Sequence, residues 1–391
     1  MCIVFWHVGL PSEEYSLIVA SNRDEFLARP TTSVAWHNWA PASSPPSTQP
    51  TPENRVLSGL DLTAGGTWFG VSLPPPSASP AAKRPALRFA TLTNFTEVIP
   101  PAKRPSRGNL TREFLDLDVS SPLQEGQAAT SLEEYLEAVE GVKGEYAGFN
   151  LLVGEGSFPS SSSSSASSSA STSIPPSVRL AYISNRESQS PSFTKRARIL
   201  DPWTSAREGK TVRGLSNATL EVEEGEEEWP KVKSGAEAVE ETVRRGEREG
   251  WKGREGEEKL AEGLYRALST PHPSPIAHRT HLRHTVLVRP LCLDPSLPLP
   301  AVPPPLPPPS STSPSSEPFD PSVLPPETEE GKREGEAGVS WYGTRVQTLL
   351  LVRSDGTVVL RERDAYVLAE EGEAKGRPRW SGRERRFEFR I

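Results

Sequence analysis

Cysteine is nearly absent from this chain of 391 residues, which contains two cysteines and a single methionine. Two thiols cannot build a disulfide framework, so the sequence favours a reducing, cytoplasmic compartment. Long apolar runs are also absent, since none approaches the roughly 20 residues of a membrane-spanning helix. The short apolar start lacks a basic segment and is followed by Glu13 and Glu14, which argues against a signal peptide. We therefore expect a soluble protein without a transmembrane segment.

A strong excess of one charge sign is missing as well. The chain has 44 basic and 51 acidic residues, for a formal net charge of −7. This balance provides no electrostatic reason to expect nucleic acid or an anionic membrane surface as a partner. We expect no nucleic-acid binding.

Proline, by contrast, is abundant at 41 residues, and it gathers with serine in blocks that show no repeat. Such blocks cannot bury enough apolar surface to offset the entropy lost on ordering. Each block joins two strand-like or helix-like segments, so we predict disordered loop insertions within a single domain spanning 1–391. The predicted insertions are 40–54, 73–85, 157–177 and 295–338. The last contains PxxP spacings that an SH3 or WW domain could bind, although a tolerated surface loop explains such spacings more often.

Short β-type runs alternate with these blocks. Two of them are separated by Gly, Pro and Ser, and two others flank an SDG turn, so each pair predicts a β-hairpin. The predicted strands are 2–8, 16–21, 87–94, 148–154, 178–184, 284–290, 346–353 and 356–363.

Helices are expected between the strands. Ser131 and Glu134 form a capping-box pattern before an apolar stripe, which predicts a helix over 131–142. A similar stripe predicts a helix over 257–269. The stretch 236–258 is mostly charged, so we expect any helix there to be marginal or solvated.

The second residue is one of the two cysteines. Because Cys2 is small, removal of Met1 would leave it as the mature amino terminus. Its α-amine, with an ordinary pKa of about 8, could then accept the proton of its own thiol. This is the chemistry of amino-terminal-nucleophile hydrolases. The alternative is a small buried residue that opens a strand.

A dense polar cluster, Asn22, Arg23, Asp24 and Glu25, directly follows the second apolar run. In a hairpin, the end of that run lies beside Cys2. Asp24 could then orient the α-amine, and Arg23 could bind a carboxylate or phosphate in bidentate fashion. The nearby positive charge should also lower the pKa of the Cys2 thiol. The alternative is a polar strand exit whose surface ion pair contributes little.

Two asparagines and a group of histidines complete the candidates. Asn94 and Asn150 lie at strand positions where a side-chain amide could donate to an oxyanion or cap its own backbone. Four of the six histidines fall in 272–284, but their spacing is irregular and the run contains no Cys or carboxylate. We therefore predict no metal site there.

Ten short motifs occur along nearly the whole chain in a fixed order: MCIVFW, SNRDEFLARPT, GGTWFGV, TLTNF, SRGNL, YAGFNLLVG, YISNRE, GLSNATLE, WPKV and YGTRVQTLLLV. In this set and order the chain resembles the transport-and-Golgi-organization-2 family, also called the NRDE family. The resemblance implies an α+β fold similar to the amino-terminal-nucleophile αββα sandwich, with mostly antiparallel sheets. It also implies an intracellular role in Golgi organization and protein secretion, in the cytoplasm or at the Golgi or another organelle. The family is further linked to haem movement and to lipid or acyl-CoA metabolism.

Only part of the family comparison extends to chemistry. Cys2 and the four residues 22–25 match the family signature. In cysteine acylases that cleave bile-salt and penicillin amides, however, an arginine stands where this chain has Ser21, so enzymatic activity stays open. One hypothesis is a carrier of an apolar or acyl ligand, with haem a candidate ligand and no firm cofactor. The other is a cysteine amidohydrolase, and an interaction scaffold is the weakest alternative. The candidate catalytic residues are Cys2, Asp24, Asn94 and Asn150, and the candidate ligand-binding residues are Asn22, Arg23 and Glu25.

Overall fold

A computed structural model describes most of the folded part of the chain. The described residues are 2–10, 12–39, 46–51, 53–74, 85–95, 104–116, 131–158, 177–186, 197–200, 211–220, 228–276, 278–293, 305–306, 340–372 and 375–391.

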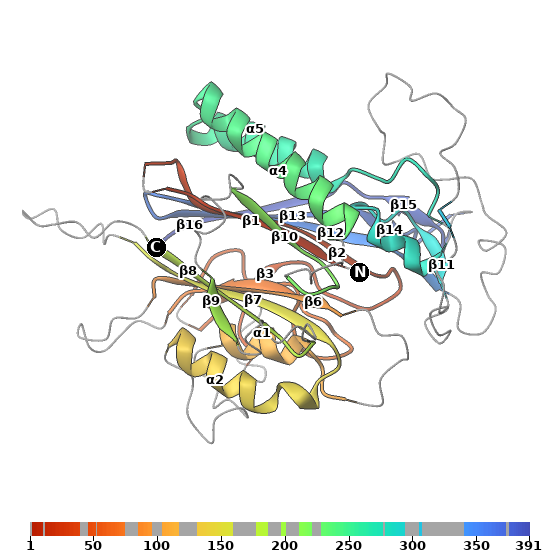
Figure 1. The fold of residues 1–391 in the computed structure, drawn as a ribbon, viewed down its shortest axis with the longest axis horizontal. Coiled ribbons are helices and arrows are strands. Elements are labelled where there is room, and N and C mark those ends of the chain that lie inside the picture. The colour runs from red at the N-terminus through yellow and green to blue at the C-terminus, as the bar shows by residue number, and fades with distance from the viewer. Residues whose placement is uncertain are drawn as a thin grey trace, which may run out of the picture.

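Two antiparallel sheets lie face to face in the middle of the molecule (Figure 1). The first sheet has the order β10 (Val212–Leu215), β1 (Ile3–Val8), β2 (Tyr15–Phe26), β12 (Ser340–Arg353), β13 (Thr357–Asp364) and β16 (Glu384–Arg390), with β11 (Leu291–Leu293) also on β12. The second runs β3 (Ala35–His37), β4 (Val56–Ser58), β5 (Phe69–Ser72), β6 (Leu87–Asn94), β7 (Phe149–Ser157), β8 (Ser177–Ser184) and β9 (Arg198–Leu200). A separate two-stranded ribbon joins β14 (Tyr366–Leu368) to β15 (Pro378–Trp380).

Helices cover the outer face of each sheet, so the molecule has four layers (Figure 1). The first sheet carries α4 (Pro230–Glu249) and α5 (Gly253–Leu268), and the second carries α1 (Gly108–Leu115) and α2 (Leu132–Val142). Two short 3-10 turns, η1 (Lys143–Glu145) and η2 (Arg279–Arg283), complete the described elements. The expected α+β class with mostly antiparallel sheets is confirmed.

Side-chain alternation along the strands builds a separate core on each face of the first sheet. Val4 and Val19 point between the sheets, where they pack in a cluster with Phe89. Their neighbours Ile3 and Ile18 point the other way, into the cluster under α4 and α5. Because both faces are buried, β1 and the first half of β2, up to Ala20, are apolar almost throughout.

The predicted hairpins and the capped helix are confirmed. β1 pairs with β2, and β12 pairs with β13, both antiparallel. Ser131 and Glu134 make the reciprocal capping-box hydrogen bonds at the start of α2.

Two expectations are wrong. The charged stretch after 230 forms a long packed helix, because Val232, Val239 and Val243 of α4 make a buried stripe. Its exposed face carries Arg–Glu pairs one turn apart. Because these charged residues outnumber the buried valines, the apolar periodicity is hard to recognise in the sequence. Residues 284–290 do not form a strand: Val288 donates its N–H to the Thr344 side chain, and β11 begins only at Leu291.

The four predicted insertions each connect two antiparallel neighbours. They fall between β3 and β4, β5 and β6, β7 and β8, and β11 and β12. Most of their residues lie outside the described residues. Of 40–54, the residues 46–51, 53 and 54 are described, and Ser47 exchanges two backbone hydrogen bonds with Trp36 at 2.8 and 2.9 Å.

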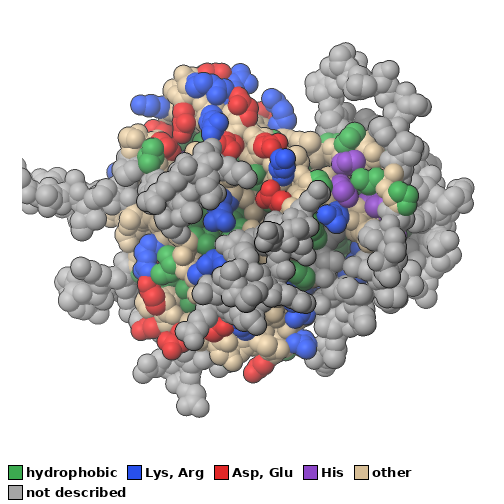
Figure 2. All heavy atoms as spheres, in the orientation of Figure 1, with side chains coloured by type: hydrophobic (Ala, Val, Ile, Leu, Met, Phe, Trp, Pro, Cys, Tyr) green, Lys and Arg blue, Asp and Glu red, His purple; other side chains and the backbone are tan. Residues whose placement is uncertain are grey.

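No helix among the described residues is long and apolar enough to cross a membrane. The surface over α4 and α5, at the top of Figure 2, mixes basic and acidic side chains. The histidines of 272–284 gather on the same face, and their rings pack edge to face in two pairs, His272 with His284 and His278 with His281.

Candidate functional site: a cleft headed by Cys2

Cys2 immediately precedes β1 and is held there by two contacts. The Ser216 hydroxyl donates to the Cys2 carbonyl oxygen at 2.7 Å. The Cys2 Sγ lies 3.9 Å from the carbonyl oxygen of Asp24. This contact follows from the antiparallel register, in which Ile3 faces Asn22. The prediction that the end of β2 lies beside Cys2 is confirmed.

The pleat of β2 separates the polar cluster into two faces. Arg23 points toward the second sheet, where its guanidinium carbon lies 4.0 Å from the centre of the Trp68 ring. Asn22 points the other way and donates to the carbonyl oxygens of Leu268 and Val286 at 2.9 and 3.0 Å. The structure therefore places Arg23 in the cleft and uses Asn22 to tie β2 to the end of α5.

A cleft of about 380 Å³ opens between the end of β2 and the start of α1. Five of the residues predicted from sequence line it: Cys2, Arg23, Asp24, Glu25 and Asn94. Four arginines reach it, since Arg29, Arg104 and Arg107 join Arg23. Trp68, Leu92 and Ala147 supply apolar wall.

Two acidic side chains face the arginines of β2 and its following turn. Arg29 Nε donates to Asp61 Oδ2 at 2.8 Å. Burial opposes ionisation of Asp61, but the hydrogen bond and charge of Arg29, together with the backbone amides of Thr63 and Ala64, outweigh it and keep the pKa of Asp61 below its usual value. Arg23 Nη2 lies 3.9 Å from a carboxylate oxygen of Glu25 and of Asp61, beyond hydrogen-bond range.

The guanidinium of Arg23 is only partly satisfied. The residue is 4% exposed, and its Nη1 has no hydrogen-bond partner among the described residues. Burial lowers its pKa, against the opposing effect of Glu25. A buried donor without an acceptor is costly, so the guanidinium of Arg23, a residue that lines the cleft, favours an anionic or carbonyl oxygen as a partner.

The Cys2 thiol and the Asp24 carboxyl, at the head of the cleft, are buried enough to shift their pKa values. Burial raises the pKa of the Cys2 thiol, and Arg23 offsets this only in part. The expectation of a lowered thiol pKa is therefore wrong, because the loss of solvation outweighs the nearby positive charge. Burial likewise raises the pKa of Asp24, although Thr344 donates to its Oδ1 at 2.7 Å.

Lys231 is a functional candidate that sequence reasoning missed. It lies in the first turn of α4, is completely buried, and has its pKa lowered by that burial. Asp24 and Cys2 partly offset the shift, so the ammonium lies within electrostatic reach of these two residues, although Lys231 does not itself line the cleft. The signal available in the sequence was the lysine directly after Trp229 and Pro230, at a helix start.

The two asparagines have different places. Asn94 lines the cleft. Asn150 is completely buried and fully hydrogen-bonded: its amide donates to the carbonyls of Ser216 and Ala218, and its oxygen accepts from Tyr182. Asn150 thus holds the loop whose Ser216 binds Cys2, and its amide points to that loop and not into the cleft.

Arg104 and Arg107 were also missed, because they come from a turn far from β2 in sequence. Arg104 Nη1 donates to the carbonyls of Gly144 and Tyr146, and Arg107 Nη1 donates to Gly148, at 2.9 to 3.0 Å. These bonds anchor both side chains at the cleft wall. Only the tertiary fold brings them to Cys2.

These features define an α+β protein of two stacked antiparallel sheets, with a cysteine at the head of its first strand facing an arginine-rich cleft. The chain belongs to the Transport and Golgi organisation 2 family, whose sequence model matches residues 1–367. It is 28% identical over 252 residues to the Transport and Golgi organization protein 2 homologs of Bos taurus and Homo sapiens. The match covers 63% of this chain and 66% and 65% of those relatives, so the chain spans just under two thirds of their length. It is also 38% identical over 76 residues to the Drosophila melanogaster protein of that name, covering 18% of this chain and 22% of the relative.

Proposed function

We propose that this chain acts in Golgi organization and protein secretion, at the cytoplasmic side of the pathway, by binding an anionic acyl small molecule in the cleft headed by Cys2. The cellular role rests on the names of its relatives. The ligand class rests on one observation: Arg23 lines the cleft with its guanidinium stacked on Trp68, and its buried Nη1 has no acceptor among the described residues.

The composition of the cleft supports an anion with an apolar stem. Guanidinium groups bind carboxylates and phosphates through paired hydrogen bonds. The four arginines of the lining outnumber its three acids, Asp24, Glu25 and Asp61, and burial raises the pKa of Asp24. Leu92 and Ala147 offer the apolar surface that an acyl stem would cover.

Haem fits the same cleft less well. Its carboxylates would suit the arginines, but the described lining contains no histidine. Cys2 is the lining residue that could ligate iron, and it does so as a thiolate. Burial raises the pKa of that thiol and disfavours the thiolate. We therefore rank an acyl anion above haem as the cargo.

Native mass spectrometry of the full chain with a panel of acyl-CoAs, free fatty acids and haem tests the proposal. We expect one acyl anion to bind at 1:1, and Arg23→Ala to weaken that complex by about tenfold or more, since hydrogen bonds to charged groups contribute roughly 1.5–3 kcal/mol. Arg179→Ala is the matched control, because Arg179 is half exposed on β8 and pairs with Glu133. Equal weakening by both variants, or no acyl binding at all, would contradict the proposal.

The second candidate is a cysteine amidohydrolase with a fold related to the amino-terminal-nucleophile hydrolases. The four layers and the place of Cys2 at the head of β1 favour it. After removal of Met1, the Cys2 amine would accept the thiol proton, and Sγ would attack the amide carbonyl. The C–N bond would break as the amine leaves with that proton, and water would hydrolyse the thioester. Asn94 would donate to the oxyanion.

Intact mass spectrometry distinguishes this candidate from the carrier. A hydrolase requires a chain that lacks Met1 and has an unblocked amine, and it should accumulate an acyl adduct on Cys2 with a slow amide substrate. A chain that retains Met1, or is acetylated at Cys2, has no base for this chemistry and excludes hydrolysis. Binding of the acyl anion without any adduct identifies the carrier.

A further inference from the structure

A second group of ionisable side chains lies outside the Cys2 cleft. It combines His7 of β1, Glu13 of the turn between β1 and β2, and Glu247 in the last turn of α4. One ligand atom from each residue lies within 4.8 Å of the other two. His7 Nε2 and Glu13 Oε2 are 2.9 Å apart. Two segments distant in sequence, the first hairpin and the end of α4, thus bring an imidazole and two carboxylates to one point.

The imidazole is held with Nε2 directed at the two carboxylates. His7 is 3% exposed, and its Nδ1 lies 3.1 Å from the carbonyl oxygen of Thr211. Because a carbonyl accepts only, Nδ1 carries a proton there, so Nε2 is the ring nitrogen that faces the two carboxylates. Nε2 and Glu13 Oε2 share a proton in their 2.9 Å hydrogen bond, and a metal ion bound to both would replace that proton. Thr211 is itself fixed by Glu240 of α4, whose Oε1 accepts from the Thr211 amide and hydroxyl at 3.3 and 3.2 Å. Metal-binding histidines commonly have such an outer partner.

A pocket of about 310 Å³ adjoins the three side chains and shares no lining residue with the Cys2 cleft. Tyr15 and Trp251 form part of its apolar wall, and Lys252 and Glu14 also line it. The group therefore borders a space that can hold a water or a small molecule next to the ligand atoms. Metal sites that also bind a water molecule or a substrate typically keep such an open coordination position.

We propose that His7, Glu13 and Glu247 bind a divalent transition-metal ion such as Zn²⁺ or Mn²⁺, leaving one side open to the pocket. Imidazole favours transition metals over Mg²⁺ or Ca²⁺, and two carboxylates with one neutral imidazole balance a charge of +2. Bonds of about 2.0–2.2 Å place two ligand atoms of one ion at most about 4.4 Å apart. The three ligand atoms here lie within 4.8 Å of one another, so binding requires a small approach of the side chains, and the exposed Glu247 has room to move.

Cobalt(II) is the probe for the full chain, because its visible absorbance reports the ligands. We expect 1:1 binding without the intense near-ultraviolet band of a cobalt thiolate, and isothermal titration should show Zn²⁺ competing for the same site. Glu247→Gln should weaken binding at least about tenfold, the scale on which even outer-shell changes act. Because Glu247 is exposed, this variant should fold.

Glu241→Gln is the matched control, since Glu241 is an exposed residue of α4 that pairs with Arg248. His7→Gln provides the second test of the ligand set. Equal affinity in wild type and Glu247→Gln would overturn the proposal, and so would a thiolate band, which would place the ion on a cysteine. The proposal would also fail if an alkylamine bound this pocket while cobalt and zinc did not.

Discussion

Arg23 of β2 stacks on Trp68, which precedes β5, with 4.0 Å between the guanidinium carbon and the ring centre. This pair joins the two sheets at the cleft. It also restrains the guanidinium and thus the direction of its Nη1, which has no hydrogen-bond partner among the described residues. The cleft is thus preorganised by an aromatic contact, and the charge that would bind a ligand is immobilised before the ligand arrives.

The stacking should be measurable by a double-mutant cycle. Arg23→Ala, Trp68→Ala and the double variant, compared by urea unfolding, should give a coupling energy of about 0.5–2 kcal/mol, as expected for a desolvated cation–π pair. Arg245 and Trp251 form the control pair, because they are 5.8 Å apart and Arg245 is half exposed. A coupling for Arg23 and Trp68 no larger than for the control pair would show that the contact is incidental.

Cys2 should react slowly at neutral pH for a cysteine that faces a cleft. Burial raises the pKa of its thiol, so the thiolate fraction at pH 7 is smaller than in the unfolded chain. The rate of alkylation, followed by mass spectrometry, should rise steeply as the pH increases above the ordinary range of cysteine. Arg23→Ala should slow it further, because Arg23 favours the thiolate.

The second cysteine provides the internal comparison. Cys292 is 6% exposed and lies in β11. Cys2 should therefore still react faster than Cys292, and Cys2→Ala should leave only the slower reaction. If native Cys2 reacted at pH 7 faster than it does in denaturant, its thiol pKa would be lowered and this account would be incorrect.

Glu362 of β13 should make stability depend on pH. It is 3% exposed, accepts from the Val34 amide at 2.9 Å, and burial raises its pKa to about 7. The folded state thus binds its proton more tightly than the unfolded state, whose pKa is about 4.5. This contribution is fully present below about pH 4.5 and is lost as the pH rises to about 7.

Glu362→Gln should remove that dependence. The difference in unfolding free energy between variant and wild type should move in favour of the variant by up to roughly 3 kcal/mol between pH 4.5 and 8. Chemical denaturation at several pH values measures it. A difference that does not change with pH would mean that Glu362 is ionised in the folded protein throughout.

The predicted insertions offer a test of the loop interpretation. Deleting 160–173 and 310–325, which lie outside the described residues, should change the unfolding free energy by less than about 1 kcal/mol. The reason is that loop closure costs only about 0.6 kcal/mol per doubling of loop length. Differential scanning calorimetry of the deletion variant and of wild type measures this change in stability. A loss of folded protein would show that these tracts pack on the domain.

Local patterns predicted the first hairpin, and with it the contact of Cys2 with the end of β2, because both depend on neighbouring residues and antiparallel geometry alone. They treated Asn22 and Arg23 as one cluster, although strand alternation places them on opposite faces. Arg104 and Arg107 could not be assigned to the cleft, since they reach it through a segment distant from β2 in sequence. The direction of the Cys2 pKa shift also depends on burial, which is a property of the assembled layers.

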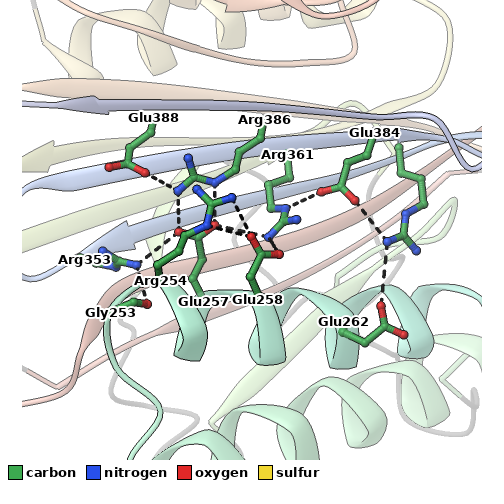
Figure 3. A network of polar contacts seen from close by, with 11 residues as sticks. Gly253, Arg254, Glu257, Glu258, Glu262, Arg353, Arg361, Glu384, Arg386 and Glu388 are labelled. Atoms are coloured by element: carbon green, nitrogen blue, oxygen red, sulfur yellow. Dashed lines mark hydrogen bonds and ion pairs between the residues drawn. The ribbon is translucent and has the colours of Figure 1, made fainter.

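Glu257 of α5 joins the helical layer to the first sheet through an ion-pair network (Figure 3). It is completely buried and pairs with Arg353 of β12, Arg361 of β13 and Arg386 of β16, at 3.3, 3.3 and 2.7 Å. Removing one partner of a buried ion pair leaves uncompensated charge and typically costs 3–5 kcal/mol. Because three arginines surround the Glu257 carboxylate, we expect this loss of stability even for a neutral replacement of the same shape, such as glutamine.

Glu257→Gln should therefore destabilise the protein by about 3–5 kcal/mol, seen as a lower urea midpoint with an unchanged slope. Glu255→Gln is the control on the same helix, because Glu255 is exposed and pairs with Lys259, and we expect less than about 0.5 kcal/mol for it. The cleft lies at the end of β2 and shares no residue with the network. Acyl binding by the folded fraction of Glu257→Gln should thus match wild type, whereas equal stability of the two variants would show that the network contributes no net stability.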